Sequence, residues 1–166
     1  SPRYLGRDYR ISSVRYYGNG KEEGDFNAAG PNVETDGFGL ALWGARAYLH
    51  YSCDKEWLDQ TTLHGDTVYE ALTQTAEDID ALLINNLPTA ECSIWETHWD
   101  YRQIFTYTAA VQIRGLFDFA AIARWYGDDE RATYYHQRGQ DLLDATIRRL
   151  VHPRWNRFVS HFNTVN

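Results

Sequence analysis

The sequence of 166 residues contains no methionine and only two cysteines. No apolar run approaches the roughly 20 residues that a membrane-spanning helix requires. Because no methionine stands at the start, we expect a processed product or a piece of a longer protein. No charged segment followed by an apolar one opens the chain, as a secretory signal would. Cys53 and Cys92 can form a disulfide or remain two free thiols, and no metal-ligand spacing is present.

The balance of charge and apolar residues excludes some classes of partner. The formal net charge of −7 disfavours binding to a nucleic-acid backbone. Apolar residues make up 43% of the chain and charged residues 23%, which is typical of a soluble globular protein. The aromatic fraction of 15% is high. Aromatic side chains build large cores, but they also line carbohydrate sites.

One carboxylate, Glu96, stands between two indoles, Trp95 and Trp99. A carboxyl group against aromatic rings loses solvation of its charged form, which raises its pKa and lets it hold a proton near neutral pH. Such a group can give that proton to a leaving oxygen. Two interpretations are open. Either Glu96 is a general acid in a carbohydrate site, or the two Trp residues are core anchors and Glu96 is a charge at the start of a helix.

Three segments carry a family pattern in the expected order. They are Ile94-Trp95-Glu96 leading into Phe105-Thr106-Tyr107, the upstream stretch Glu34-Thr35-Asp36-Gly37-Phe38-Gly39, and the weaker Trp155-Asn156-Arg157-Phe158-Val159. The first resembles the general-acid segment of glycoside hydrolase family 15, the glucoamylase family. The second is similar to the stretch that opens an inner helix at that family's sugar site. The resemblance covers most of the chain, from about Phe26 to Phe162.

The resemblance implies roles for particular residues. Glu96 is expected to be the general acid of an inverting glycosidase. Trp95 and Trp99 would form apolar walls beside Glu96 and stack on a sugar ring. Asp36 and Glu34 would accept hydrogen bonds from sugar hydroxyls. Asp36 is equally well explained as the cap of its helix. The family's catalytic base comes from a loop nearer the C-terminus, so we expect this chain alone to lack it.

The site loop contains one further candidate, His98. It is either a hydrogen-bonding residue of the sugar site or an exposed side chain. We expect no cofactor and no metal. The expected partners are an oligosaccharide or polysaccharide substrate and either the rest of a longer chain or another subunit. Neither a nucleic acid nor a membrane is expected, and the location, cytoplasmic or secreted, is not indicated.

Apolar periodicity predicts four long helices, at about residues 36–51, 65–85, 105–126 and 130–150. The first and third are apolar on several sides, so we expect them to be buried, and the second and fourth on one side. Gly127 and the aspartates after it are expected to separate the last two helices. Residues 1–33 contain seven glycines or prolines and read as a loop-rich lead-in.

We therefore predict an all-α fold, with residues 34–166 forming two inner/outer helical hairpins. The resemblance implies that these are part of an (α/α)6 toroid and that residues 1–166 are a single partial catalytic domain. Two alternatives stay open. One is a non-catalytic glucoamylase-like domain that binds sugar or protein. The other is a different six-hairpin sugar enzyme, such as a trehalase, a disaccharide phosphorylase or a debranching enzyme.

Overall fold

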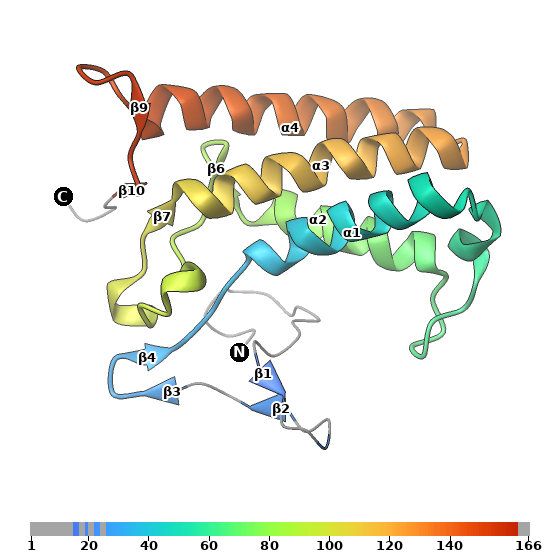
Figure 1. Cartoon of the computed structure of the whole chain (residues 1–166), viewed down its shortest axis with the longest axis horizontal. Helices are drawn as coiled ribbons and strands as arrows, with labels where there is room; N and C mark the ends of the chain where they lie inside the picture. The colour runs from blue at the N-terminus through green and yellow to red at the C-terminus, as the bar shows by residue number, and fades with distance from the viewer. Residues whose placement is uncertain (1–14, 17–18, 20–21, 24–25, 163–166) are drawn as a thin grey trace.

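The computed structural model describes residues 15–16, 19, 22–23 and 26–162, and in this part of the chain the fold is mainly helical. The α-helices there are α1 Asp36–Ser52, α2 Val68–Ala81, α3 Thr106–Tyr126 and α4 Asp129–Leu150. Helices α1 and α3 run in the same direction, and α2 and α4 run back (Figure 1). Helix α3 lies between α1 and α4 and packs against both. None of the described helices is long and apolar enough to cross a membrane.

Short elements connect the helices. The 3₁₀ turns are η2 Lys55–Asp59, η3 Ser93–Trp95 and η4 Trp99–Tyr101. Antiparallel pairs join β1 Arg15–Tyr16 to β2 Glu22–Glu23, β3 Phe26–Asn27 to β4 Gly30–Pro31, β5 Leu83–Ile84 to β6 Leu87–Pro88, β7 Ile104–Phe105 to β10 His161–Phe162, and β8 Val151–His152 to β9 Arg157–Phe158. The loop that carries η3 and η4 lies beside β4 and β7, at the end where α3 begins (Figure 1).

The prediction of four long helices is confirmed, but α2 is shorter than predicted at both ends. It begins at Val68 because Thr67 and Glu70 form a capping box, in which Thr67 Oγ1 accepts from the Glu70 N–H and Glu70 Oε2 accepts from the Thr67 N–H. It ends early because Asn85 and Asn86 have φ values of 53° and 60°. Two consecutive left-handed residues form a tight hairpin turn, which joins β5 to β6.

The boundary between α3 and α4 is as the sequence predicts. Gly127 has φ 108° and ends α3 in the left-handed region. Asp128 then caps α4 by accepting the Arg131 N–H on Oδ1 at 3.0 Å. Its Oδ2 accepts the Tyr69 hydroxyl of α2 at 2.9 Å. The cap therefore also ties the α3–α4 junction to α2.

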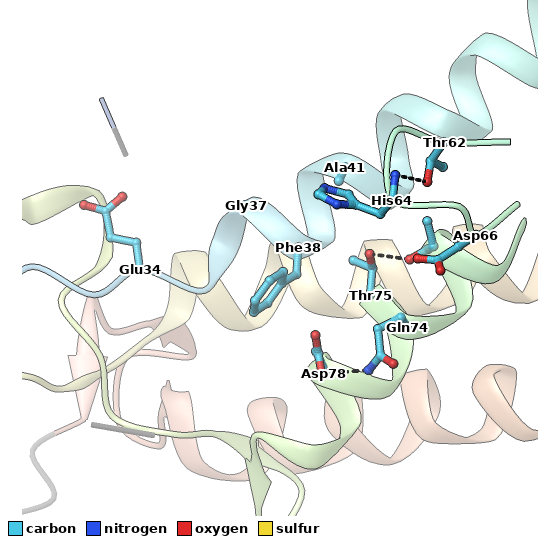
Figure 2. A pocket seen from close by; sticks show the side chains of 11 residues that line it. Glu34, Gly37, Phe38, Ala41, Thr62, His64, Asp66, Gln74, Thr75 and Asp78 are labelled. Carbon is cyan, nitrogen blue, oxygen red and sulfur yellow. Dashed lines mark hydrogen bonds between the residues drawn. The ribbon is translucent and has the colours of Figure 1, made fainter. Parts of the chain in front are cut away.

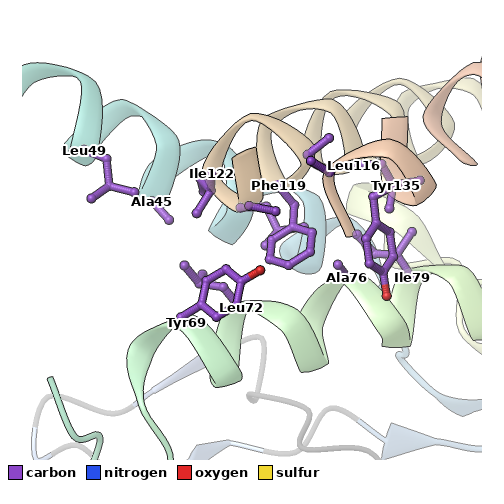
Figure 3. Close-up of a cluster of buried hydrophobic side chains, with 14 of the residues drawn as sticks. Ala45, Leu49, Tyr69, Leu72, Ala76, Ile79, Leu116, Phe119, Ile122 and Tyr135 are labelled. Carbon is purple, nitrogen blue, oxygen red and sulfur yellow. The ribbon is translucent and has the colours of Figure 1, made fainter. Parts of the chain in front are cut away.

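Aromatic rings from three helices form the centre of the core (Figure 3). Tyr69 of α2 stacks on Tyr126 with ring centroids 3.9 Å apart, and it lies parallel to Phe119 at 6.0 Å. Phe119 is fully buried and meets the edge of Tyr135 from α4 at 5.0 Å. Offset and edge contacts of this kind stabilise a core beyond the area they bury. They join α2, α3 and α4 in one core.

Two glycines allow α1 and α3 to approach closely. A Cβ on Gly115 would lie 2.6 Å from the Cα of Gly39, and a Cβ on Gly39 would collide with the Val111 carbonyl. Any larger residue at either position would force the helices apart. The crossing lies near the start of α1 and so sets where Asp36 stands relative to α3.

The prediction that α1 is buried on several sides is wrong for this chain. Leu42, Ala45 and Leu49 are buried, but Trp43 is 49% exposed and Tyr51 86% exposed. One stripe of α1 packs on α2 and α3, and its opposite side has no covering element within the described residues. Helix α3 is buried on more sides because both α1 and α4 pack on it.

The remaining expectations concern the two ends and the cysteines. The lead-in expected for residues 1–33 lies largely outside the described residues, and its described part contributes β1 to β4. The C-terminal segment forms two short ladders, β8 with β9 and β10 with β7. Cys53 and Cys92 are both free; the first is exposed and the second is buried.

Candidate functional site

The candidate site loop is closed at its base by a short antiparallel bridge. Glu91 and Gln103 exchange both backbone hydrogen bonds at 3.0 Å. The loop between them contains η3, Glu96, His98 and η4. The loop follows β6 in the chain and is followed by β7 and α3. The loop is therefore built as a unit that stands at the N-terminus of α3.

The loop is anchored to the segment that precedes α1. The Cys92 N–H donates to the Val33 carbonyl at 2.8 Å, and the Val33 N–H donates to Cys92 Sγ at 3.2 Å. The thiol is fully buried, and burial raises its pKa to about 11. A thiol in this state is a packing and hydrogen-bonding group and not a nucleophile. Residues 59 positions apart in the sequence are thus held side by side.

His98 fixes the same loop to the β3–β4 hairpin. Its Nδ1 lies 3.1 Å from the Gly30 carbonyl, and its Nε2 lies 2.8 Å from Asn27 Nδ2. A carbonyl accepts and an amide nitrogen donates, so these partners select the neutral ring protonated on Nδ1. The Asn27 amide is itself oriented because its Oδ1 accepts the Ala29 N–H. Both ring nitrogens are engaged within the protein, and the role of His98 toward a sugar stays a prediction.

Trp99 packs against the hairpin and carries a cation on its ring. A Cβ added to Gly30, whose φ is +93°, would lie 2.8 Å from the Trp99 Cβ, so only glycine fits against Trp99 at this point. The Arg102 guanidinium lies 4.4 Å from the centroid of the Trp99 ring and donates to the Trp99 carbonyl at 2.7 Å. The Asp100 N–H also reaches the Ala29 carbonyl. Trp99 is a half-buried anchor of the loop.

Glu96 and Trp95 form the outward part of the loop. Glu96 follows η3 in the left-handed region at φ 50°, and its N–H donates to the Ser93 carbonyl. Its side chain is exposed, and Trp95 is 64% exposed. Trp95 thus leaves the carboxylate accessible to solvent. A desolvated acid at this position requires a bound substrate or further protein to cover it.

Asp36 and Glu34 bring more negative charge to the same end of the helices. Asp36 is buried at the first turn of α1, where its Oδ1 accepts the Gly37 N–H at 3.0 Å. Thr35, and not Asp36, is the N-cap residue. Glu34 Oε1 accepts from Asn32 Nδ2 at 2.8 Å. The pKa of Tyr107 at the start of α3 is raised by burial and then by the charge of Asp36 and hydrogen bonding to it.

Glu91 is a buried carboxylate of this site that the sequence patterns do not reveal. This side chain is 0% exposed, and burial raises its pKa to about 7. It accepts hydrogen bonds from Thr35, Ser93 and Thr108. No motif marks it, and an isolated Glu before a cysteine gives no periodic signal.

An open groove of about 350 Å³ lies between the first half of α1 and α2 (Figure 2). Phe38 and the polar side chains of His64, Gln74 and Asp78 line it. Glu34 belongs to its rim but lies apart from this polar group in Figure 2. Among the described residues no cluster of His, Cys, Asp or Glu has the arrangement of a metal site.

Comparison of the chain with protein-family models, with curated proteins and with solved structures finds no significant match. The functional interpretation therefore depends on the residues and their contacts.

Proposed function

We propose that this protein is a glycoside hydrolase of the glucoamylase type that hydrolyses α-glucosidic bonds with inversion. One observation carries the proposal. The segment with Glu34 and Asp36 and the loop with Trp95 and Glu96 are joined by direct hydrogen bonds, from Cys92 to Val33 and from Thr35 to Glu91. The two segments that carry the proposed sugar-site patterns are thus held together at the N-terminal ends of α1 and α3.

Glu96 is the proposed general acid. Its exposed carboxyl group can reach a glycosidic oxygen, and the exposed face of Trp95 beside it can stack on a sugar ring. A sugar bound there removes water from the carboxyl group, which favours its protonated form. In this proposal Asp36 and Glu34 accept hydrogen bonds from sugar hydroxyls. Trp99 contributes through the loop geometry because its ring is occupied by Arg102.

The base of an inverting mechanism stands roughly 6.5–9.5 Å from the acid and activates a water on the opposite face of the sugar. We assign this role to no residue of the present chain. The proposed arrangement is part of an (α/α)6 toroid, with α1 and α3 as inner helices and α2 and α4 as outer ones. The parallel course of α1 and α3, and the uncovered apolar side of α1, support this arrangement.

The proposal is tested with the protein expressed from its complete reading frame. We expect phosphate-independent hydrolysis of maltose or isomaltose, with β-glucose as the first product by NMR. Glu96→Gln should lower kcat by about 10²–10⁴-fold because the proton donor is lost. Asp100→Asn, which removes an exposed carboxylate of the same loop, should leave kcat unchanged. Equal rates for wild type and Glu96→Gln would exclude Glu96 as the acid.

A binding protein without turnover is the second candidate. The exposure of both Glu96 and Trp95 favours it, because a surface indole binds sugar without any need for a protonated acid. In that case the protein binds oligosaccharide, Trp95→Ala abolishes binding, and no product forms. Phosphorolysis in place of hydrolysis would instead indicate a disaccharide phosphorylase.

A further inference from the structure

A buried carboxylate lies at the junction of the three segments that build the candidate site. Glu91 is 0% exposed, and its own backbone forms the bridge to Gln103 that closes the site loop. A buried carboxylate without partners is strongly destabilising, so its hydrogen bonds decide whether the junction is stable.

The side chain of Glu91 accepts three hydrogen bonds, each from a different segment. Its Oε2 accepts the Thr35 N–H at 3.2 Å and the Ser93 N–H at 3.0 Å. Its Oε1 accepts the Thr108 hydroxyl of α3 at 2.8 Å. All three donors are buried. The lead-in to α1, the site loop and α3 are therefore joined through one carboxylate.

Two of these donors stand next to the proposed substrate-facing residues. Thr35 directly precedes Asp36, and Ser93 opens the 3₁₀ turn η3 that Glu96 follows. Ser93 has φ +51°, a left-handed conformation that a serine rarely adopts without support. The bond from its N–H to Glu91 supplies that support.

We propose that Glu91 is a positioning residue that holds the Glu96 loop on the Asp36 segment, and that its protonation loosens this hold. The inference rests on the proposed function in so far as Glu96 and Asp36 are the groups that face the sugar. The three hydrogen bonds to Glu91 are a property of the fold and can be measured without substrate.

The hydrogen bonds explain why the proton matters. The Oε2 atom faces two N–H donors, so an added proton must reside on Oε1. There it donates to the Thr108 oxygen, whose own hydroxyl then turns to Ser93 Oγ, 3.4 Å away. Oε2 becomes a neutral carbonyl oxygen, which accepts more weakly than a carboxylate. The bonds to Thr35 and Ser93 are thus strongest when Glu91 is ionised.

This titration falls in the neutral range. Burial raises the pKa of Glu91 to about 7; the three hydrogen bonds oppose this rise, and the charge of Asp36 on α1 contributes to it. The other titratable neighbour is Cys92 of the loop, whose raised pKa keeps it neutral in this range. From α3, the group that faces Glu91 is the Thr108 hydroxyl, which does not titrate. Glu91 is therefore expected to change charge near neutral pH.

The test follows the amide signals of Thr35 and Ser93 by ¹⁵N NMR over about two pH units on either side of neutrality, in the full-length protein. In wild type both should titrate with one midpoint near the pKa of Glu91. In Glu91→Gln, which keeps an acceptor for the two N–H groups but cannot titrate, both should stay flat. Glu77→Gln, an exposed glutamate of α2, should behave as wild type.

Glu91→Ala removes the acceptors and should speed hydrogen exchange of the Ser93 amide at least tenfold relative to amides of α4. If the Ala variant does not fold, the Gln comparison still decides. Amide shifts that titrate equally in wild type and Glu91→Gln would overturn the inference. So would Glu91→Ala with unchanged exchange at Ser93.

Activity separates this inference from the proposed function. If sugar is hydrolysed, Glu91→Gln should remove the Glu91 limb from the pH profile of kcat while KM changes little. If the Thr35 and Ser93 amides titrate but no sugar is hydrolysed, the positioning role of Glu91 is supported and the glycosidase proposal is overturned. If sugar is hydrolysed but wild type and Glu91→Gln have the same pH profile and the same amide titrations, the glycosidase proposal is supported and the positioning role of Glu91 is overturned.

Discussion

Ser93, Glu96 and His98 all have positive φ values, at 51°, 50° and 59°. Left-handed conformations in residues other than glycine cost free energy and persist where surrounding contacts impose them. The contacts are present here: the Ser93 N–H binds Glu91, and both nitrogens of His98 bind the β3–β4 hairpin. Strain of this kind often clusters at functional sites. In the proposed function, Glu96 is the side chain that this segment presents.

Glu91 should make stability depend on pH with a definite sign. Its pKa rises from an ordinary 4.5 to about 7 on folding. Between these values the native protein keeps a proton that the unfolded chain has released, so the free energy of unfolding falls as pH rises through the window. The loss is about 3 kcal/mol at most. Urea unfolding of wild type and Glu91→Gln at several pH values measures it, and equal slopes for both would contradict the assignment.

This global loss is compatible with a firmer loop at high pH. The desolvation free energy of the buried carboxylate of Glu91 exceeds the stabilisation from its hydrogen bonds, so ionisation lowers the stability of the whole fold. The same charge strengthens the two bonds to Thr35 and Ser93. Global unfolding and local exchange therefore respond to this one proton in opposite directions.

At the scale of elements, the crossing of α1 and α3 decides the site geometry. Gly39 and Gly115 meet there with no space for a side chain. Tyr107 of α3 then faces Asp36 at the start of α1, as the raised pKa of Tyr107 reflects. Gly44 lies farther along α1, and a Cβ there would meet nothing within 4 Å.

Gly115→Ala should therefore destabilise the fold by about 1–3 kcal/mol, because the added methyl group collides with the α1 backbone. The matched change Gly44→Ala should stabilise it by up to ~1 kcal/mol, because alanine favours helix and has room. Thermal unfolding of both variants measures the difference. If both changes raise Tm equally, the helices do not approach as described.

Helix positions were readable from the sequence because their signals are local. Gly127 and Asp128 mark the α3–α4 boundary through chemistry that acts within one turn. The end of α2 was missed because Leu82 and Leu83 continue the apolar stripe while the following Asn85 and Asn86 turn the chain. Periodicity alone does not separate a last helical turn from a short hairpin.

At the scale of the whole molecule, the apolar residues of α1 are divided between two sides. Leu42 and Leu49 face the core, while Leu40, Trp43 and Tyr51 are exposed. On the neighbouring α3, Trp125 is 40% exposed. Large apolar side chains on parallel helices favour a further covering layer. This agrees with the proposed toroid, in which additional helices would pack there.

The candidate site was predictable only in part. Glu96, Asp36 and their neighbours were identified from short patterns, and the contacts that join their segments came only with the fold. Glu91 and Gly30 could not be found in advance, because their roles depend on partners 56 and 69 positions away along the chain, Thr35 and Trp99. Likewise, the exposure of Trp95 depends on what else surrounds the loop.

The most direct measurement of the central claim compares two substrates that differ only in their need for a proton. In the full-length protein, Glu96→Gln should lose about 10²-fold or more in kcat on maltose, whose leaving oxygen must be protonated. On α-glucosyl fluoride, whose leaving group departs as an anion, the same variant should retain nearly all of the wild-type rate. Equal losses on both substrates, or no loss on either, would contradict the assignment of Glu96 as the proton donor.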